Sequence, residues 1–246
     1  MRELIFITGA DKKCEWLLPW WLGKFRKYNT LAHTPVIIAD FGLSDKARQW
    51  CVNKGLEVQK ITGKAGWYMK PSALRQIKPE SKRVWVDVDC EVVKDCTEIF
   101  EYIEKDKLTC STDRHHSWGC KFQTGVVGVM GDPDILQKWE ASCLNPKGPY
   151  GRGDQELLWE LTTKISDKNI KELPEKFNWL RMSLLKGEDD KDKRIIHWTG
   201  EEGKKIIIKS IREKKRTTDY FIDTRPPNNP TGYNGLMNPT NGQKIS

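Results

Sequence analysis

The most constraining feature of the sequence is the alternation of short apolar runs and longer helical patterns over its first quarter. Residues 4–8 (LIFIT) and 36–39 are apolar runs of strand length, and 56–61 forms a third candidate strand. A helical pattern over 15–28 separates the first two, and a second helix begins at an N-cap, Ser44. Continuous apolar runs are typical of parallel strands buried on both faces. The order predicts an α/β fold with right-handed crossovers and a ligand crevice where the strands end.

The same pattern continues along most of the chain. Helices are expected over 70–77, 97–105, 132–144, 154–165 and 203–216, and strands over 84–89, 107–111, 122–130 and 194–198, with 172–179 extended. Gly125 and Gly128 lie within one of these strands, where glycine allows a close approach of backbone. Residues 224–246 are rich in Pro, Asn and Gly, which predicts a tail that wraps the surface or is disordered.

Two aspartates stand at the end of the predicted strand over 84–89. In RVWVDVD, the period of two of a strand puts Asp87 and Asp89 on the same side, one pleat apart. Adjacent carboxylates repel each other unless a cation lies between them, and oxygen ligands suit Mg²⁺ or Mn²⁺. The alternative, a solvated start of a loop, is the commoner meaning of a bare Asp-x-Asp. The expected position at the same sheet edge as residues 8–11 and Asp40 favours the metal site and predicts that a nucleotide lies across this edge.

Composition and charge narrow the class of protein. The chain has 246 residues, 37% of them hydrophobic, and 11 tryptophans, which indicates a globular chain with a sizeable core. The net charge of +8 is compatible with an anionic partner, but the lysines are spread out and often followed by acids. Only residues 204–216 form a dense basic run, and such a run is usually a solvated helix face. We therefore expect no nucleic acid partner.

Targeting and cysteine patterns indicate a cytoplasmic protein. The apolar run near the N-terminus is too short for a signal peptide, and no stretch reaches the length of a transmembrane helix, which leaves only peripheral membrane contact open. The 7 cysteines show no CxxC spacing, which argues against a zinc site or a disulfide framework.

Several segments, in order, resemble one known family. The stretches DFGLSDKARQW, MKPSALRQIKP, RVWVDVDCEVVKDCTEIF, FQTGVVGV, GDQELLWEL, ELPEKFNW and IIHWTGEEGKK resemble the GT-A glycosyltransferases, most closely glycosyltransferase family 8, the glycogenin and bacterial galactosyltransferase group. Each motif is weak alone, but their order and spacing make the resemblance specific as far as Lys205. It implies a single Rossmann-like GT-A domain over 1–223, with a mostly parallel central sheet flanked by helices. Residues 1–95 would form the nucleotide-sugar-binding half and 96–223 the acceptor-binding half.

The resemblance implies a metal centre. Asp87 and Asp89 match the metal-binding Asp-x-Asp motif, and His197 matches the third protein ligand of a Mn²⁺ that bridges the phosphates of a nucleotide sugar. An imidazole among carboxylates also favours Mn²⁺ over Mg²⁺ on ligand grounds. Taken alone, a histidine such as His197 is more often a packed or capping residue.

Lysines complete the implied phosphate site. Gly200 and Lys204 resemble the glycine and the phosphate-binding lysine that follow the histidine in the family. The family usually reads HxxGxxKPW where this chain has HWTGEEGKK, so Lys205 is an alternative to Lys204. Lys70 stands where a basic residue often contacts the donor phosphate. A surface or packing role is the alternative for this lysine.

Further residues are implied at the sugar and at the nucleoside. Asp154 and Gln155 match an Asp-Gln pair, with Gln155 near the anomeric carbon and Asp154 on sugar or acceptor hydroxyls. An aspartate that caps a helix is the alternative reading of this pair. Thr8, Asp11 and Asp40 are candidates for contacts to the base and ribose.

These assignments predict a metal-dependent glycosyltransferase that moves a sugar from a nucleotide sugar, UDP-sugar above all, to a glycan or another hydroxyl acceptor. Family 8 enzymes retain the anomeric configuration, and because Gln155 is a poor nucleophile, front-face attack is the favoured route. A sugar nucleotidyltransferase is one alternative, although TGADKK lacks the glycine-rich, arginine-bearing first loop of that class. A basic binding module for nucleic acid or another polyanion, using residues 204–216, is the other.

Overall fold

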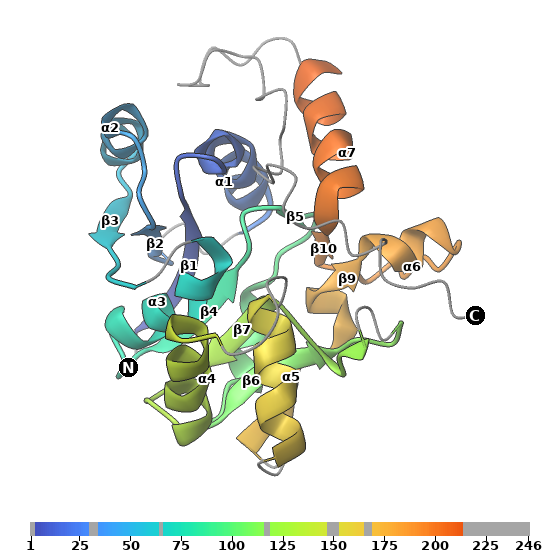
Figure 1. Cartoon of the computed structure of the whole chain (residues 1–246). Coiled ribbons are helices and arrows are strands. Elements are labelled where there is room, and N and C mark those ends of the chain that lie inside the picture. Colours follow the sequence, from blue (N-terminus) through green and yellow to red (C-terminus); the bar gives the residue numbers. More distant parts are fainter. Residues whose placement is uncertain are drawn as a thin grey trace, which may run out of the picture.

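The structure, a computed structural model, describes residues 3–29, 34–63, 66–115, 119–146, 153–164 and 169–213, so the predicted tail over 224–246 lies outside the described residues. Its central sheet has seven strands in the order β3-β2-β1-β4-β7-β6-β8 (Figure 1). They are β1 (Leu4–Ala10), β2 (Val36–Asp40), β3 (Glu57–Lys60), β4 (Lys82–Val86), β6 (Leu108–Thr112), β7 (Phe122–Val129) and β8 (Ile170–Glu172). The pairs β3–β2, β2–β1, β1–β4 and β6–β8 are parallel, whereas β7 is antiparallel to both β4 and β6. The prediction of a mostly parallel sheet is confirmed.

Helices cover both faces of this sheet. The described helices are α1 (Leu18–Tyr28), α2 (Asp45–Asn53), α3 (Lys70–Gln76), α4 (Asp134–Leu144), α5 (Asp154–Lys164), α6 (Arg181–Leu185) and α7 (Gly200–Glu213), with short 3-10 segments at η1 (Glu15–Leu17), η2 (Gly66–Met69), η3 (Thr97–Tyr102) and η6 (Glu175–Phe177). Phe6 and Ala10 of β1 lie in one buried cluster with residues of α1 and α2. Ile5 and Ile7, which point the other way, lie in a second cluster with residues of α3, α4 and α5. The prediction of strands buried on both faces is therefore confirmed.

Local capping explains several helix boundaries. Ser44 is the N-cap of α2, where its Oγ accepts a hydrogen bond from Ala47 N at 3.2 Å. Pro19 lies in the first turn of α1, where its missing N–H is not needed. Helix α7 begins at Gly200, three residues before the predicted start, and the φ of +75° at this residue favours glycine. The predicted helix over 97–105 is instead the 3-10 segment η3.

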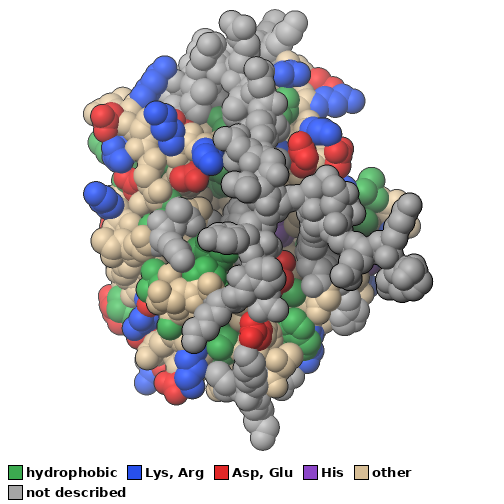
Figure 2. Space-filling model, viewed as in Figure 1, with side chains coloured by type: hydrophobic (Ala, Val, Ile, Leu, Met, Phe, Trp, Pro, Cys, Tyr) green, Lys and Arg blue, Asp and Glu red, His purple; other side chains and the backbone are tan. Residues whose placement is uncertain are grey.

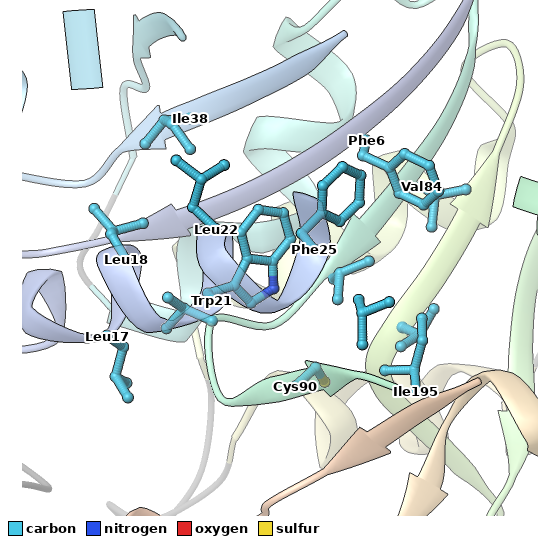
Figure 3. Close-up of a cluster of buried hydrophobic side chains, with 14 of the residues drawn as sticks. Phe6, Leu17, Leu18, Trp21, Leu22, Phe25, Ile38, Val84, Cys90 and Ile195 are labelled. Carbon is cyan, nitrogen blue, oxygen red and sulfur yellow. The ribbon is translucent and has the colours of Figure 1, made fainter. Parts of the chain in front are cut away.

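A second, smaller sheet packs beside the first. Its strands β5 (Cys90–Val92), β9 (Trp179–Leu180) and β10 (Ile195–His197) have the order β5-β10-β9, with β10 antiparallel to β5 and parallel to β9. Helix α1 joins the two sheets, since its Trp21 and Phe25 belong to the same buried cluster as Phe6 of β1 and Cys90 and Ile195 of the small sheet (Figure 3). The rings of Trp21 and Phe25 stack with centroids 4.9 Å apart. This aromatic packing holds the small sheet at one face of the central sheet.

Charges of both signs are mixed on the surface. In Figure 2, lysine and arginine side chains lie beside aspartates and glutamates over the described parts of the face that is drawn. Within the described segments, no helix combines the length and the apolar composition that crossing a membrane requires.

Candidate active site

The two aspartates lie in a turn between the two sheets. Strand β4 ends at Val86, and Asp87 to Asp89 turn the chain into β5 rather than extending the strand as predicted. The reason is a hydrogen bond from Cys90 N to the carbonyl oxygen of Asp87 at 2.9 Å, which closes the turn. The carboxylates nevertheless stand at the carboxyl end of β4. This is the sheet edge where Ala10 of β1 pairs with Asp40 of β2, so the predicted edge is confirmed.

His197 reaches the aspartates through the small sheet. In β10 it pairs with Cys90 of β5, the residue that directly follows the turn, and Trp198 N donates to the carbonyl oxygen of Asp89 at 3.1 Å. Nε2 of His197 therefore lies 3.5 Å from Asp89 Oδ1 and 3.8 Å from Asp87 Oδ2. The three residues that the sequence predicts as metal ligands are brought together from two sheets.

These residues fit a divalent cation. Their separations exceed the usual length of a hydrogen bond between nitrogen and oxygen, so the carboxylates and the imidazole face a common space rather than pairing tightly. Two carboxylates and an imidazole suit Mn²⁺. The thiol of Cys90 is a further possible ligand, because the ligand atoms of Asp89, Cys90 and His197 all lie within 4.8 Å of one another. The sequence alone did not predict it. Its only signal in the sequence is that it adjoins Asp89.

Lys204, rather than Lys205, belongs to this cluster. Lys204 Nζ lies 3.5 Å from Asp89 Oδ2, whereas Lys205 is exposed and pairs with Glu202 at 2.6 Å. An ideal Cβ at Gly203 would lie 2.1 Å from the carbonyl oxygen of Trp198, so glycine at 203 lets α7 pack closely on the end of β10. Gly203 stands where the motif HxxGxxKPW has its lysine. Its missing side chain lets α7 pack close to Trp198, and this packing brings Lys204 to Asp89.

The charges at Asp89 and Lys204 support each other. Burial favours the neutral acid, but Lys204 and His197 hold the pKa of Asp89 below its usual range. Burial likewise opposes the charged amine, but Asp89 raises the pKa of Lys204 above its ordinary value. Both groups are therefore ionised at neutral pH.

Lys70 links Asp87 to the sugar-side aspartate. Its side chain is buried at the start of α3, with Nζ 3.1 Å from Asp87 Oδ1 and 3.0 Å from Asp154 Oδ2, and it donates to the carbonyl oxygen of Thr124 at 2.8 Å. Thr124 Oγ1 donates to Asp154 Oδ2 at 2.8 Å, a contact that the sequence analysis did not predict. Although burial opposes the charge, Asp154 and Asp87 raise the pKa of Lys70. Burial raises the pKa of Asp87, which also accepts a hydrogen bond from Trp85 Nε1 at 2.5 Å.

Asp11 and Asp40 hold the loops that follow β1 and β2. Asp11 Oδ1 accepts hydrogen bonds from the backbone of Lys13 and Cys14 at 2.9 and 3.0 Å. Asp40 Oδ1 accepts from the backbone of Gly42 and Leu43, and its Oδ2 from Arg48 Nε at 2.6 Å. Burial opposes ionisation, but these donors, Arg48 first, hold the pKa of Asp40 below its usual range. Both carboxylates therefore shape this edge of the site through local turns.

The other predicted residues lie in the same region of the fold. Thr8 is buried in β1, and its hydroxyl has no hydrogen-bond partner in the described part of the chain. Gln155 is the second residue of α5, directly after Asp154, and is partly buried. Gly200 opens α7 next to the strand that carries His197.

Comparisons with known proteins place this geometry in context. No family model and no curated protein matches the chain. Among solved structures, the chain is similar to the galactosyltransferase LgtC in complex with donor and acceptor sugar analogs, with 14% identity, a TM-score of 0.62 and coverage of 80% of this chain and 87% of that one.

Two other structures have comparable likeness. The glycosyltransferase GlyE of Streptococcus pneumoniae TIGR4 has 15% identity and a TM-score of 0.62 over 81% of this chain, which spans 55% of the GlyE chain. Mouse xyloside xylosyltransferase 1 has 11% identity and a TM-score of 0.52 over 80% of this chain and 97% of that one. Similarity at this level of identity establishes the fold. Together with the strand order and the two helical layers, it shows that this chain has the fold of the GT-A glycosyltransferases.

Proposed function

We propose that this chain is a metal-dependent glycosyltransferase that moves a sugar from a nucleotide sugar, UDP-sugar above all, to a hydroxyl of a glycan or another acceptor. The observation that carries the proposal is the meeting of Asp87, Asp89 and His197 at the carboxyl edge of the central sheet. The fold neighbours support it, since LgtC is a galactosyltransferase whose structure holds donor and acceptor sugar analogs. Residues 1–95 would bind the donor and 96–223 the acceptor.

Each residue of the cluster has a part in this proposal. Asp87, Asp89 and His197 would hold Mn²⁺ in preference to Mg²⁺. When bound, Mn²⁺ would neutralise negative charge on the diphosphate. Lys204 would bind the diphosphate and stabilise the negative charge that develops as it leaves. Lys70 would contribute positive charge near the donor phosphate while it orients Asp87 and Asp154.

The proposed route retains the anomeric configuration by front-face attack. The bond from the anomeric carbon to the diphosphate oxygen breaks, the acceptor oxygen bonds to the same face of that carbon, and the acceptor proton passes to the departing phosphate. Gln155 would lie near the anomeric carbon, but its amide is a poor nucleophile, and the carboxylate of Asp154 is engaged by Lys70 and Thr124. A glycosyl-enzyme trapped on Asp154 would contradict this route.

A donor screen tests the function without knowledge of the acceptor. UDP-, GDP- and TDP-sugars are incubated with the protein, and release of the nucleoside diphosphate is measured with and without Mn²⁺. We expect metal-dependent hydrolysis of a UDP-sugar that Asp89→Asn reduces about 100-fold, because the neutral amide is a much weaker metal ligand than the carboxylate. Asp189→Asn, at an exposed carboxylate, is the matched control and should hydrolyse the donor at the wild-type rate.

Two outcomes would contradict the proposal. Hydrolysis that is absent for every donor, or that survives Asp89→Asn unchanged, argues against a metal-dependent transferase. Synthesis of a UDP-sugar from UTP and a sugar 1-phosphate would instead identify a nucleotidyltransferase.

A further inference from the structure

A glycine on β7 lies directly against the imidazole of His197. An ideal Cβ at Gly125 would lie 2.2 Å from both Cε1 and Nδ1 of His197, and 3.0 Å from its Cγ. Favourable contacts between such atoms occur at about 3.5–4.0 Å, so no side chain larger than hydrogen fits while the ring keeps its place. The ring of His197 therefore rests on the bare backbone of β7.

The same glycine holds the turn that carries the aspartates. The carbonyl oxygen of Gly125 accepts a hydrogen bond from Asp87 N at 2.8 Å, and the thiol of Cys90 lies 3.8 Å from the same oxygen. Gly125 thus contacts both the Asp87 turn and His197, the two parts of the metal cluster that come from different sheets.

Among the described residues, no hydrogen-bond partner orients the imidazole from its far side. Nδ1 of His197 is buried without a partner among the residues that the structure describes, and the side chain is 8% exposed. In most protein metal sites, the second nitrogen of a ligating histidine donates to a carboxylate or a carbonyl, and this contact fixes the ring. Here the direction of Nε2 toward the aspartates depends on packing against Gly125.

We propose that Gly125 is a positioning residue for the metal centre, because its missing side chain leaves space for the ring of His197 to pack and point toward Asp87 and Asp89. This inference rests on the proposed metal site and adds a residue that does not itself touch the metal. A methyl group at position 125 displaces the ring, and with it one of the three ligands.

The first measurement is the Mn²⁺ affinity of the full chain by isothermal titration calorimetry. We expect Gly125→Ala to weaken Mn²⁺ binding about 10–100-fold, the usual effect of losing an outer-shell contact to a ligand. Gly128→Ala is the matched control on the same strand. Its Cβ would meet Ile103 Cγ1 at 2.8 Å, away from His197, so it should lower stability and leave the Mn²⁺ affinity unchanged.

A second measurement needs no metal and covers the case in which Gly125→Ala folds poorly. The three atoms nearest to the added Cβ all belong to His197, so His197→Ala makes room for it. We expect the double variant Gly125→Ala/His197→Ala to have a higher unfolding midpoint in urea than Gly125→Ala alone, although two residues are changed. A simple loss of strand stability at position 125 would not be relieved in this way.

The outcomes separate this inference from the proposed function. If the wild type binds Mn²⁺ and Gly125→Ala binds it equally well, the positioning role is wrong while the metal site stands. If the double variant is no more stable than Gly125→Ala, the packing of the His197 ring against Gly125 is likewise refuted. A wild type that binds no Mn²⁺ refutes the proposed function, and the positioning role for a metal falls with it.

Discussion

At the scale of single residues, the site depends on how buried charges compensate one another. Lys70 lies between Asp87 and Asp154, and Lys204 lies beside Asp89, so each carboxylate near the predicted metal position has a cation in contact. Removing one member of such a buried group leaves the others uncompensated in a medium that solvates them poorly.

Lys70→Met tests this compensation. We expect it to lower the free energy of unfolding by about 3–5 kcal/mol in metal-free buffer at neutral pH, because Asp87 and Asp154 lose the ammonium between them. Urea denaturation measures the change.

The control for this variant is a lysine in an exposed ion pair. Lys107 Nζ lies 2.7 Å from Glu104, with both side chains about 40% exposed, and ion pairs this exposed contribute little to stability. Equal stability of Lys70→Met and Lys107→Met would show that the ammonium of Lys70 does not stabilise the buried carboxylates of Asp87 and Asp154.

At the scale of elements, helix α7 and strand β10 form one unit of the site. The close approach of Gly203 to the carbonyl of Trp198 brings Lys204 near Asp89, and the indole of Trp198 donates to Glu91 Oε2 of β5 at 2.8 Å. Helix position and strand pairing thus act together on the ligands, since a shift of α7 moves Lys204 relative to the strand that carries His197.

Glycine substitutions in two helices should change stability with opposite signs. Gly203→Ala places a methyl group against backbone that cannot move aside, and we expect a loss of about 1–3 kcal/mol. Gly23→Ala, on the exposed side of α1, meets nothing within 4 Å and should gain about 0.5–1 kcal/mol from helix propensity. Urea denaturation of both variants gives the comparison, and a stabilised Gly203→Ala would contradict the packing of α7 on β10.

At the scale of the whole molecule, the two buried clusters enclose most of the thiols. All 7 cysteines are thiols outside any disulfide, and all except Cys14 are buried. Burial raises the pKa of Cys14 to about 12, and those of Cys51 and Cys96 also to about 12, so few thiolates exist at neutral pH. Thiol reactivity therefore reports on the integrity of both clusters.

Labelling with Ellman's reagent measures this property. Without denaturant we expect slow reaction, because the thiolate is the reactive form and burial raises the pKa of the thiols. Cys14 should react first because it is only partly buried. In concentrated guanidinium chloride without reductant, all 7 thiols should react. Rapid labelling of several cysteines in the native protein would show that the clusters are less closed than the packing indicates.

Much of the fold could be predicted because the signals are local. The apolar runs over 4–8 and 36–39 and the N-cap Ser44 depend only on neighbours in the chain, and each was confirmed. The parallel order of the first strands follows from the helices between them. The end of the strand before Asp87 was predicted three residues too late, because a turn that closes on one backbone hydrogen bond leaves the alternating pattern of RVWVDVD intact.

The sequence by itself determined the α/β class, the edge where the aspartates lie and the residue types of the cluster. Only the tertiary structure decided that Lys204 rather than Lys205 meets Asp89, that Lys70 bridges to Asp154, and that His197 rests on Gly125. The physical reason is distance along the chain. Periodicity and capping act between near neighbours, whereas the partner of a buried charge or ring is set by how strands and helices from separate parts of the chain pack together.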